Sequence, residues 1–181
     1  MFARVFRGLA AATVLVVAVS SSADAQMEKP SRFGVSGGVS LPMGDFGDIA
    51  GLGFHIGGHF QAPINDKLHF RANLDLGRYG GDDDFGVDNV MIMGAVANLV
   101  LPINTQSALK PYVFGGLGFY NWEIEGTGGG SLDDSDLAFN FGAGYDFKWG
   151  GKSMFTEVRF LSLLTEDDAT NMIPITIGIR F

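Results

Sequence analysis

The segment Phe139-Asn140-Phe141-Gly142-Ala143-Gly144-Tyr145-Asp146-Phe147-Lys148-Trp149 alternates between two kinds of side chain. Its odd positions are aromatic or apolar, whereas its even positions are polar or glycine. Successive side chains of a β-strand point to opposite faces, so a strand would place all of these rings on one side. A helix would scatter the same rings around its circumference. The segment therefore predicts a β-strand with one apolar face and one polar face.

The same period of two recurs along most of the chain. The segment from Asn89 to Leu101 is apolar on both faces. Its one polar residue inside the run, Asn98, indicates that the odd positions Met91, Met93, Ala95, Ala97 and Leu99 point outward. For Pro111 to Trp122, the sequence leaves the orientation open. Pro174 interrupts the last segment, which a strand tolerates best near its end or at a bulge. All eight segments have about the length that a tilted membrane strand needs. They are residues 33–41, 54–61, 68–77, 89–101, 111–122, 139–149, 153–164 and 173–181.

Composition narrows the class of protein. Charged residues make up 18% of the chain, whereas a typical soluble domain carries about 25%. The sequence has no cysteine, which excludes disulfides, thiol chemistry and a lipoprotein anchor. The net charge of -8 argues against a nucleic-acid partner, because phosphate binding needs a basic surface.

The amino terminus has the features of a secretory signal peptide. Arg4 and Arg7 precede an apolar run from Leu9 to Val19, and Ala23-Asp24-Ala25 fits a cleavage site after Ala25. The alternative is a permanent anchor helix, but that would need about 20 apolar residues. We therefore expect residues 1–25 to be removed and residues 26–181 to form one barrel domain without a second domain.

The connections between the predicted strands alternate in character. The first, third, fifth and seventh are acidic and lack lysine and arginine, whereas the second, fourth and sixth are residues 63–67, 102–110 and 150–152, each ending in a lysine. An up-and-down meander sends alternate connections to opposite ends of a barrel. Because outer-membrane barrels have long external loops and short periplasmic turns, we expect the acidic loops outside the cell. Their acidic residues are Asp45, Asp48, Asp82, Asp83, Asp84, Asp88, Glu123, Glu125, Asp133, Asp134, Asp136, Glu166, Asp167 and Asp168.

The segment Pro111-Tyr112-Val113-Phe114-Gly115-Gly116-Leu117-Gly118-Phe119-Tyr120 and the terminal strand Ile175-Thr176-Ile177-Gly178-Ile179-Arg180-Phe181 resemble a known family. This family is that of the small outer-membrane barrels, which includes opacity proteins and OmpA/OmpX-like barrels. The resemblance covers residues 26–181. It implies an all-β, eight-stranded antiparallel barrel in the outer membrane, with Phe181 ending the strand that the barrel-assembly machinery recognises. It does not imply one activity.

Several charged residues are predicted to face the barrel interior. An eight-stranded barrel has room for side chains rather than for a wide channel. Charges there must pair, because an isolated buried ion costs several kcal/mol. We expect an ion-paired plug, with a small gated conduit as the alternative. The residues are Arg71, Asp75, Asp146, Lys148, Glu157, Arg159 and Arg180.

The sequence carries no distinct sign of catalysis or of a cofactor. His55 and His59 would lie about 13 Å apart on a strand, too far to share a metal ion, and neither a His-Glu-x-x-His motif nor a Gly-x-Ser-x-Gly motif is present. Together with His69 they are expected to line the barrel, and divalent ions at the acidic loops stay a hypothesis. We expect a non-enzymatic envelope protein with lipid-facing Phe, Ile and Leu, and with Trp122, Trp149 and Tyr145 near the interfaces. Expected partners are membrane lipids, lipopolysaccharide, the assembly machinery and an extracellular ligand of the loops. The alternatives are a narrow pore and a soluble periplasmic barrel that binds an apolar ligand inside.

Overall fold

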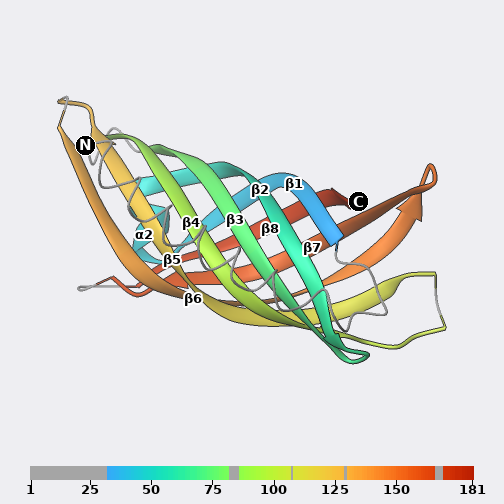
Figure 1. The fold of residues 1–181 in the computed structure, drawn as a ribbon. Helices are drawn as coiled ribbons and strands as arrows, with labels where there is room; N and C mark the ends of the chain where they lie inside the picture. The colour runs from blue at the N-terminus through green and yellow to red at the C-terminus, as the bar shows by residue number, and fades with distance from the viewer. Residues whose placement is uncertain (1–31, 82–85, 107, 129, 166–168) are drawn as a thin grey trace.

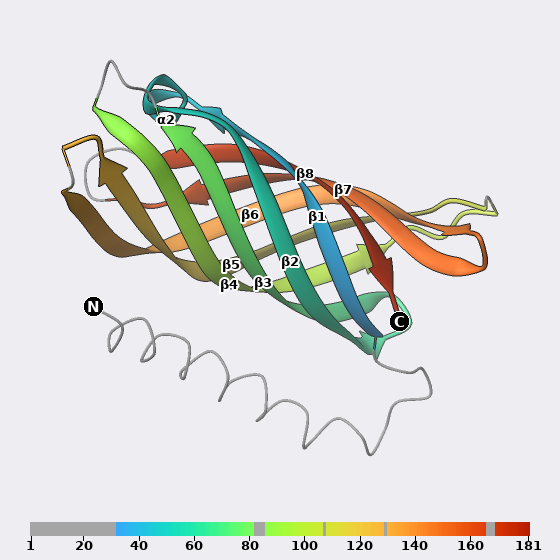
Figure 2. The same cartoon turned by 90° about the horizontal axis from the view of Figure 1, so that it is seen from above.

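The computed structural model describes residues 32–81, 86–106, 108–128, 130–165 and 169–181. Within these residues, eight antiparallel strands close into one barrel, in which each strand pairs with its neighbours in sequence and the first pairs with the last. Figures 1 and 2 show the strands winding steeply around a common axis. The predicted fold is confirmed. The strands are β1 (Arg32–Met43), β2 (Ala50–Asn65), β3 (Leu68–Gly81), β4 (Val87–Pro102), β5 (Lys110–Gly126), β6 (Ser131–Trp149), β7 (Lys152–Leu163) and β8 (Thr170–Arg180).

The predicted apolar faces lie on the outside of the barrel. Phe141 of β6, Val158 of β7 and Ile177 of β8 each expose more than half of their surface. On β4, Met91 and Leu99 point outward as expected, and Asn98 points inward. The orientation of β5, which the sequence left open, places Leu117 and Phe119 outside. The result is a continuous apolar belt, too large for a protein surface in contact with water alone.

The strands end at two chemically different poles. At the turn end, β1 begins, β8 ends, and short connections join β2 to β3, β4 to β5 and β6 to β7. Gly150 and Gly151 form the last of these connections with φ angles of 57° and 77°. A two-residue hairpin turn of this hand needs positive φ at both positions, which glycine adopts without strain. The other pole, the loop end, carries the four connections predicted to be acidic.

The loop end differs from the sequence prediction in three places. One of them is Asp88, which was predicted in the third connection and lies in β4. After β1 the chain forms a short helix, α2 (Asp45–Ile49), which the sequence did not predict. The fifth connection is much shorter than expected, because β5 and β6 continue to Gly126 and from Ser131. Five of its predicted acidic loop residues therefore lie in strands, namely Glu123, Glu125, Asp133, Asp134 and Asp136. Their polarity marks where the hairpin leaves the apolar belt rather than where the strands end.

Pro174 lies inside β8 and interrupts one of its two ladders. Its position still pairs with Ser40 of β1, but the pairing of β8 with β7 skips from Val158–Ile175 to Leu161–Met172. Because proline has no backbone N–H to donate, one neighbouring strand must lose a ladder bond. The local break lies beside Arg159, whose side chain points into the barrel.

Candidate functional site

Charged side chains meet inside the half of the barrel nearer the turn end. Arg71 of β3 donates through Nη1 to Oε1 of Glu157 on β7 at 2.5 Å, and both residues are buried. Arg180 of β8 lies 3.6 Å from the same oxygen and pairs through Nη1 with Asp146 of β6. Tyr112 of β5 donates its hydroxyl to Glu157 at 2.6 Å and accepts a hydrogen bond from Arg180 at 3.1 Å. These contacts join five strands across the lumen, and we call them the lower network.

Aromatic rings and polar neighbours fill the space around the two guanidinium groups. The Cζ atom of Arg71 lies 5.2 Å from the ring centre of Tyr112 and 5.3 Å from that of Phe114. Arg180 stacks on Phe155 at 4.4 Å. Such cation–π contacts gain strength where water is excluded. Arg71 also donates through Nε to the side-chain oxygen of Gln61, and Arg180 donates through Nε to His59.

A second ion pair lies closer to the loop end. Arg159 of β7 donates to Asp75 of β3 at 2.8 Å, and Tyr120 of β5 donates its hydroxyl to the same carboxylate at 2.8 Å. Nearby, His55 Nε2 hydrogen-bonds Thr176 Oγ1 at 2.9 Å. A cavity of about 20 Å³ borders these residues, which is room for roughly one water molecule. We call this set the upper pair.

Above the upper pair, the lumen is closed by apolar side chains. Phe46 of α2 packs edge-on against Tyr79 of β3, with 5.2 Å between their ring centres. Tyr79 in turn donates its hydroxyl to Ser40 at 2.9 Å and contacts the sulfur of Met172. This apolar cap also contains Ala50, Val87, Val90, Ile92, Val96, Tyr120, Ala138, Leu161 and Leu163. The barrel is therefore polar inside near the turn end and apolar inside near the loop end.

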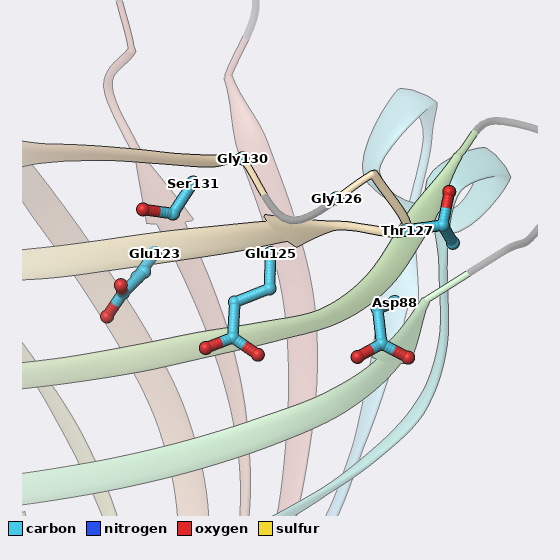
Figure 3. Close-up of a pocket in the computed structure, with 7 residues that line it drawn as sticks. All are labelled: Asp88, Glu123, Glu125, Gly126, Thr127, Gly130 and Ser131. Carbon is cyan, nitrogen blue, oxygen red and sulfur yellow. The ribbon is translucent and has the colours of Figure 1, made fainter.

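An acidic hollow lies at the tip of the β5–β6 hairpin. It encloses about 710 Å³ and is lined by Asp88, Glu123, Glu125 and Ser131 beside the glycine-rich turn. Figure 3 shows Asp88, Glu123 and Glu125 pointing to the same side of the strands. Asn89 donates its side-chain amide to Glu125 and, at 3.4 Å, to Asp88. The hairpin tip is tied down where the Thr127 N–H donates to the Gly86 carbonyl at 2.9 Å.

Six of the seven residues predicted to face the interior take part in the lower network or the upper pair. They are Arg71, Asp75, Asp146, Glu157, Arg159 and Arg180. Lys148 does not join them, since it lies exposed near the end of β6, beyond the depth at which the lumen is filled. Phe181 is 74% exposed at the turn end, and its N–H donates to the Phe33 carbonyl at 2.8 Å.

Each histidine has a polar partner inside the barrel or at its rim. His55 contacts Thr176, His59 accepts from Arg180, and His69 Nδ1 lies 2.8 Å from the amide of Gln61. Within the described residues, no group of three His, Asp or Glu side chains is placed to hold a metal ion. The acidic residues 82–84 and 166–168, and the predicted signal peptide, lie outside the described residues.

The interior aromatic side chains were not predicted from the sequence. Tyr112, Phe114 and Tyr120 point inward and contact the buried ions, but glycine on both faces of this segment hid its parity. Trp122 was predicted at the membrane interface and instead packs against the apolar cap, donating its indole N–H to Asp136 at 2.6 Å. The sequence does contain a signal for the inward face of β5, because Tyr112, Phe114, Tyr120 and Trp122 all occupy even positions. Trp149 and Tyr145 do point outward, with 71% and 40% of their surface exposed.

The family model described as "Outer membrane protein beta-barrel domain" matches residues 10–181, nearly the whole chain. The chain belongs to this family of outer-membrane β-barrels. Its predicted location in the outer membrane is confirmed, and the apolar belt is the surface that the bilayer covers. The alternative of a soluble barrel with an apolar-ligand site is wrong, since its apolar faces would have to point inward. No described helix has the length and hydropathy to cross a bilayer.

Solved structures of outer-membrane barrels share this fold at low sequence identity. Neisserial surface protein A matches with a TM-score of 0.64 and 16% identity, over 83% of this chain and 95% of that chain. Ail, the attachment invasion locus protein of Yersinia pestis, matches with a TM-score of 0.55 and 18% identity, over 86% and 100%. The outer membrane enzyme PagL matches with a TM-score of 0.55 and 12% identity, over 84% and 99%. No curated protein matches the sequence.

Proposed function

We propose that this outer-membrane barrel is a non-enzymatic anchor that displays its loop end at the cell surface. The observation that carries the proposal is the contrast between the two parts of the molecule. The lumen is filled by two ion-paired layers and an apolar cap, whereas the β5–β6 hairpin extends beyond the belt with exposed acidic side chains. A filled interior suits a rigid support, and an extended polar hairpin suits contact with molecules outside.

The filled interior favours an anchor over the narrow pore. A gated conduit would require Glu157 to release both Arg71 and Arg180, and Phe46 to leave the apolar cap. We therefore expect the purified protein in planar bilayers to give no large, steady single-channel current. A stable open state would favour the conduit instead.

The contacts of the three histidines favour a structural role over catalysis. PagL demonstrates that an outer-membrane barrel can be an enzyme. In this chain the His55–Thr176 pair resembles a base beside a hydroxyl, but the adjoining cavity of about 20 Å³ leaves no room for a substrate. Hydrolysis assays with lipid and peptide substrates are expected to be negative for the wild-type protein and unchanged by Thr176→Val.

The outer surface of the barrel offers contacts for three further partners. The apolar belt contacts lipid chains. At its loop-end border, exposed Arg78 lies between Phe54 and Met91 on the outside, where a cation can pair with a lipopolysaccharide phosphate. At the turn end, the exposed terminal Phe181 is accessible to the barrel-assembly machinery.

Labelling of single cysteines in intact cells tests the display of the loop end. The natural chain has no cysteine, so each introduced thiol is the only one present. A membrane-impermeant maleimide should label Asp133→Cys on the hairpin in intact cells. Lys152→Cys, at the start of β7 next to the β6–β7 turn, is the matched control and should react only after the cells are lysed. The reverse pattern would overturn the proposed orientation.

A further inference from the structure

One edge of the protruding hairpin has no strand beside it in the described part of the chain. Strand β5 is covered by β4 as far as Gly126, but the pairing of β6 with β7 reaches only Ala138–Leu163, followed by one bond from Leu164 N–H to the Leu137 carbonyl. Residues Ser131 to Ser135 of β6 lie beyond it. In Figure 1 the β5–β6 hairpin rises well away from the end of β7. We call residues 131–137 the hairpin edge.

The backbone geometry identifies which groups of the hairpin edge are available. The Gly126 N–H donates to the Gly130 carbonyl, so the even residues 132, 134 and 136 direct their N–H and C=O groups toward β5. The odd residues Asp133, Ser135 and Leu137 therefore direct theirs away from β5. The Leu164–Leu137 bond agrees with this parity, since it approaches Leu137 from the β7 side.

A side chain already occupies one of these outward groups. The Ser135 N–H donates to Oδ1 of Asp134, its own neighbour, at 2.7 Å. Exposed strand edges are templates for pairing with other chains, and charged side chains limit unwanted pairing. Asp133, Asp134 and Asp136 give every copy of this edge the same charge, which disfavours pairing between two copies. The same charges favour a basic partner.

We propose that the hairpin edge binds an extended, basic segment of a partner protein by adding it as a further β-strand next to β6. The Ser135 N–H leaves the Asp134 carboxylate, and main-chain hydrogen bonds from Asp133 and Ser135 then supply the binding, in the manner of strand addition. Lysine or arginine side chains on one face of the segment lie against Asp134 and Asp136, which share a face of β6. The inference rests on the proposed display function for access to the edge in the cell.

The test uses the full mature protein purified from outer membranes and placed in lipid nanodiscs. The probe is a synthetic octapeptide of alternating lysine and valine, and the control peptide has glutamate in place of lysine. Binding is measured by titration, and amide exchange is followed by NMR. The lysine peptide should bind and slow exchange at Asp133 and Ser135, while the even residues 132, 134 and 136 keep the exchange rates they had before.

Two variants separate strand addition from simple charge attraction. Ser135→Pro removes an outward N–H without touching the β5 ladder, and should weaken binding about tenfold, as expected for the loss of one or two hydrogen bonds. The matched control Ser135→Ala keeps the N–H and should bind like wild type. If Ser135→Pro binds as tightly as Ser135→Ala, the peptide is held by charge alone and the proposal is wrong.

The remaining outcomes also decide the question. If the odd amides are already protected without peptide and the protein is dimeric, a second copy occupies the edge, which overturns the proposal. Absence of peptide binding overturns it as well. Either result leaves the cysteine-labelling test of orientation untouched, because binding in nanodiscs, where both faces are accessible, does not depend on which end faces the cell exterior.

Discussion

The guanidinium of Arg71 and the carboxylate of Glu157 meet across the lumen at 2.5 Å, from strands β3 and β7. In a closed eight-stranded barrel these two strands lie opposite each other. The pair between Arg159 and Asp75 joins the same two strands one layer nearer the loop end. Two ion pairs inside the lumen thus cross the diameter of the barrel and hold its opposite walls together.

Glu157→Gln removes the charge that Arg71 and Arg180 share. Arg71 would stay buried without its counter-ion and Arg180 would keep only Asp146, and loss of one partner of a buried pair costs about 3–5 kcal/mol. We expect a drop of that size in the free energy of unfolding, measured by urea titration of the folded barrel in lipid bilayers. Asp133→Asn on the exposed hairpin is the control and should leave stability unchanged. If Glu157→Gln left the free energy of unfolding unchanged, the lower network would not stabilise the barrel.

Tyr120→Phe deletes the hydroxyl that donates to Asp75. The carboxylate keeps its bond to Arg159 but loses one buried donor, which costs about 1–3 kcal/mol. The matched variant is Tyr145→Phe, because Tyr145 points outward from β6 toward lipid. Equal effects of the two substitutions on urea unfolding would contradict the inward orientation of β5.

Ile177→Arg places a charge on the lipid-facing side of β8. Ile177 lies between Gly37 of β1 and Thr156 of β7, and 53% of its surface is exposed to the bilayer side. Near the middle of the membrane this change should cost about 2–4 kcal/mol. Refolding into lipid vesicles, followed by the heat-dependent shift in gel mobility, measures the loss. Ile177→Leu is the control. If Ile177→Arg refolds as well as wild type, residue 177 lies outside the hydrocarbon layer.

Phe181→Ala tests recognition of the last strand by the assembly machinery. The ring is 74% exposed and makes little contact within the barrel, so refolding in detergent should proceed as for wild type. The amount of folded protein in the outer membrane of cells should fall several-fold. Phe33→Ala, on the neighbouring strand at the same level, is the control. Equal cellular levels of the two variants would count against the proposed signal.

The alternation of β6 and β8 was sufficient to predict the barrel and its lipid-facing side. Phe141, Tyr145 and Ile177 point outward because side chains alternate between the two faces of a strand. Once the apolar face is turned to lipid, the direction of every side chain on that strand is fixed. The interior ions could be predicted for the same reason, since Asp146 and Arg180 occupy the polar parity of these strands.

The interior aromatic residues and the hairpin could not be predicted in this way. Around Tyr112 and Tyr120 both faces carry apolar or aromatic residues and glycine, so hydrophobicity does not distinguish them, and only the tyrosines and Trp122 at even positions indicate the inward face. The acidic residues of the hairpin were assigned to a loop, because strand propensity and polarity conflict there. Which arginine meets which carboxylate depends on the register between distant strands, and a single strand's sequence does not encode it.

In this barrel, apolar side chains face lipid and ionic side chains face inward, and spin-label accessibility along β8 tests this arrangement most directly. Single cysteines at positions 175 to 179, in a chain with no natural cysteine, carry a nitroxide in barrels reconstituted into bilayers. We expect positions 175, 177 and 179 to be accessible to oxygen dissolved in the lipid, whereas positions 176 and 178 should be shielded. Oxygen accessibility without this alternation, or with the opposite parity, would contradict this arrangement.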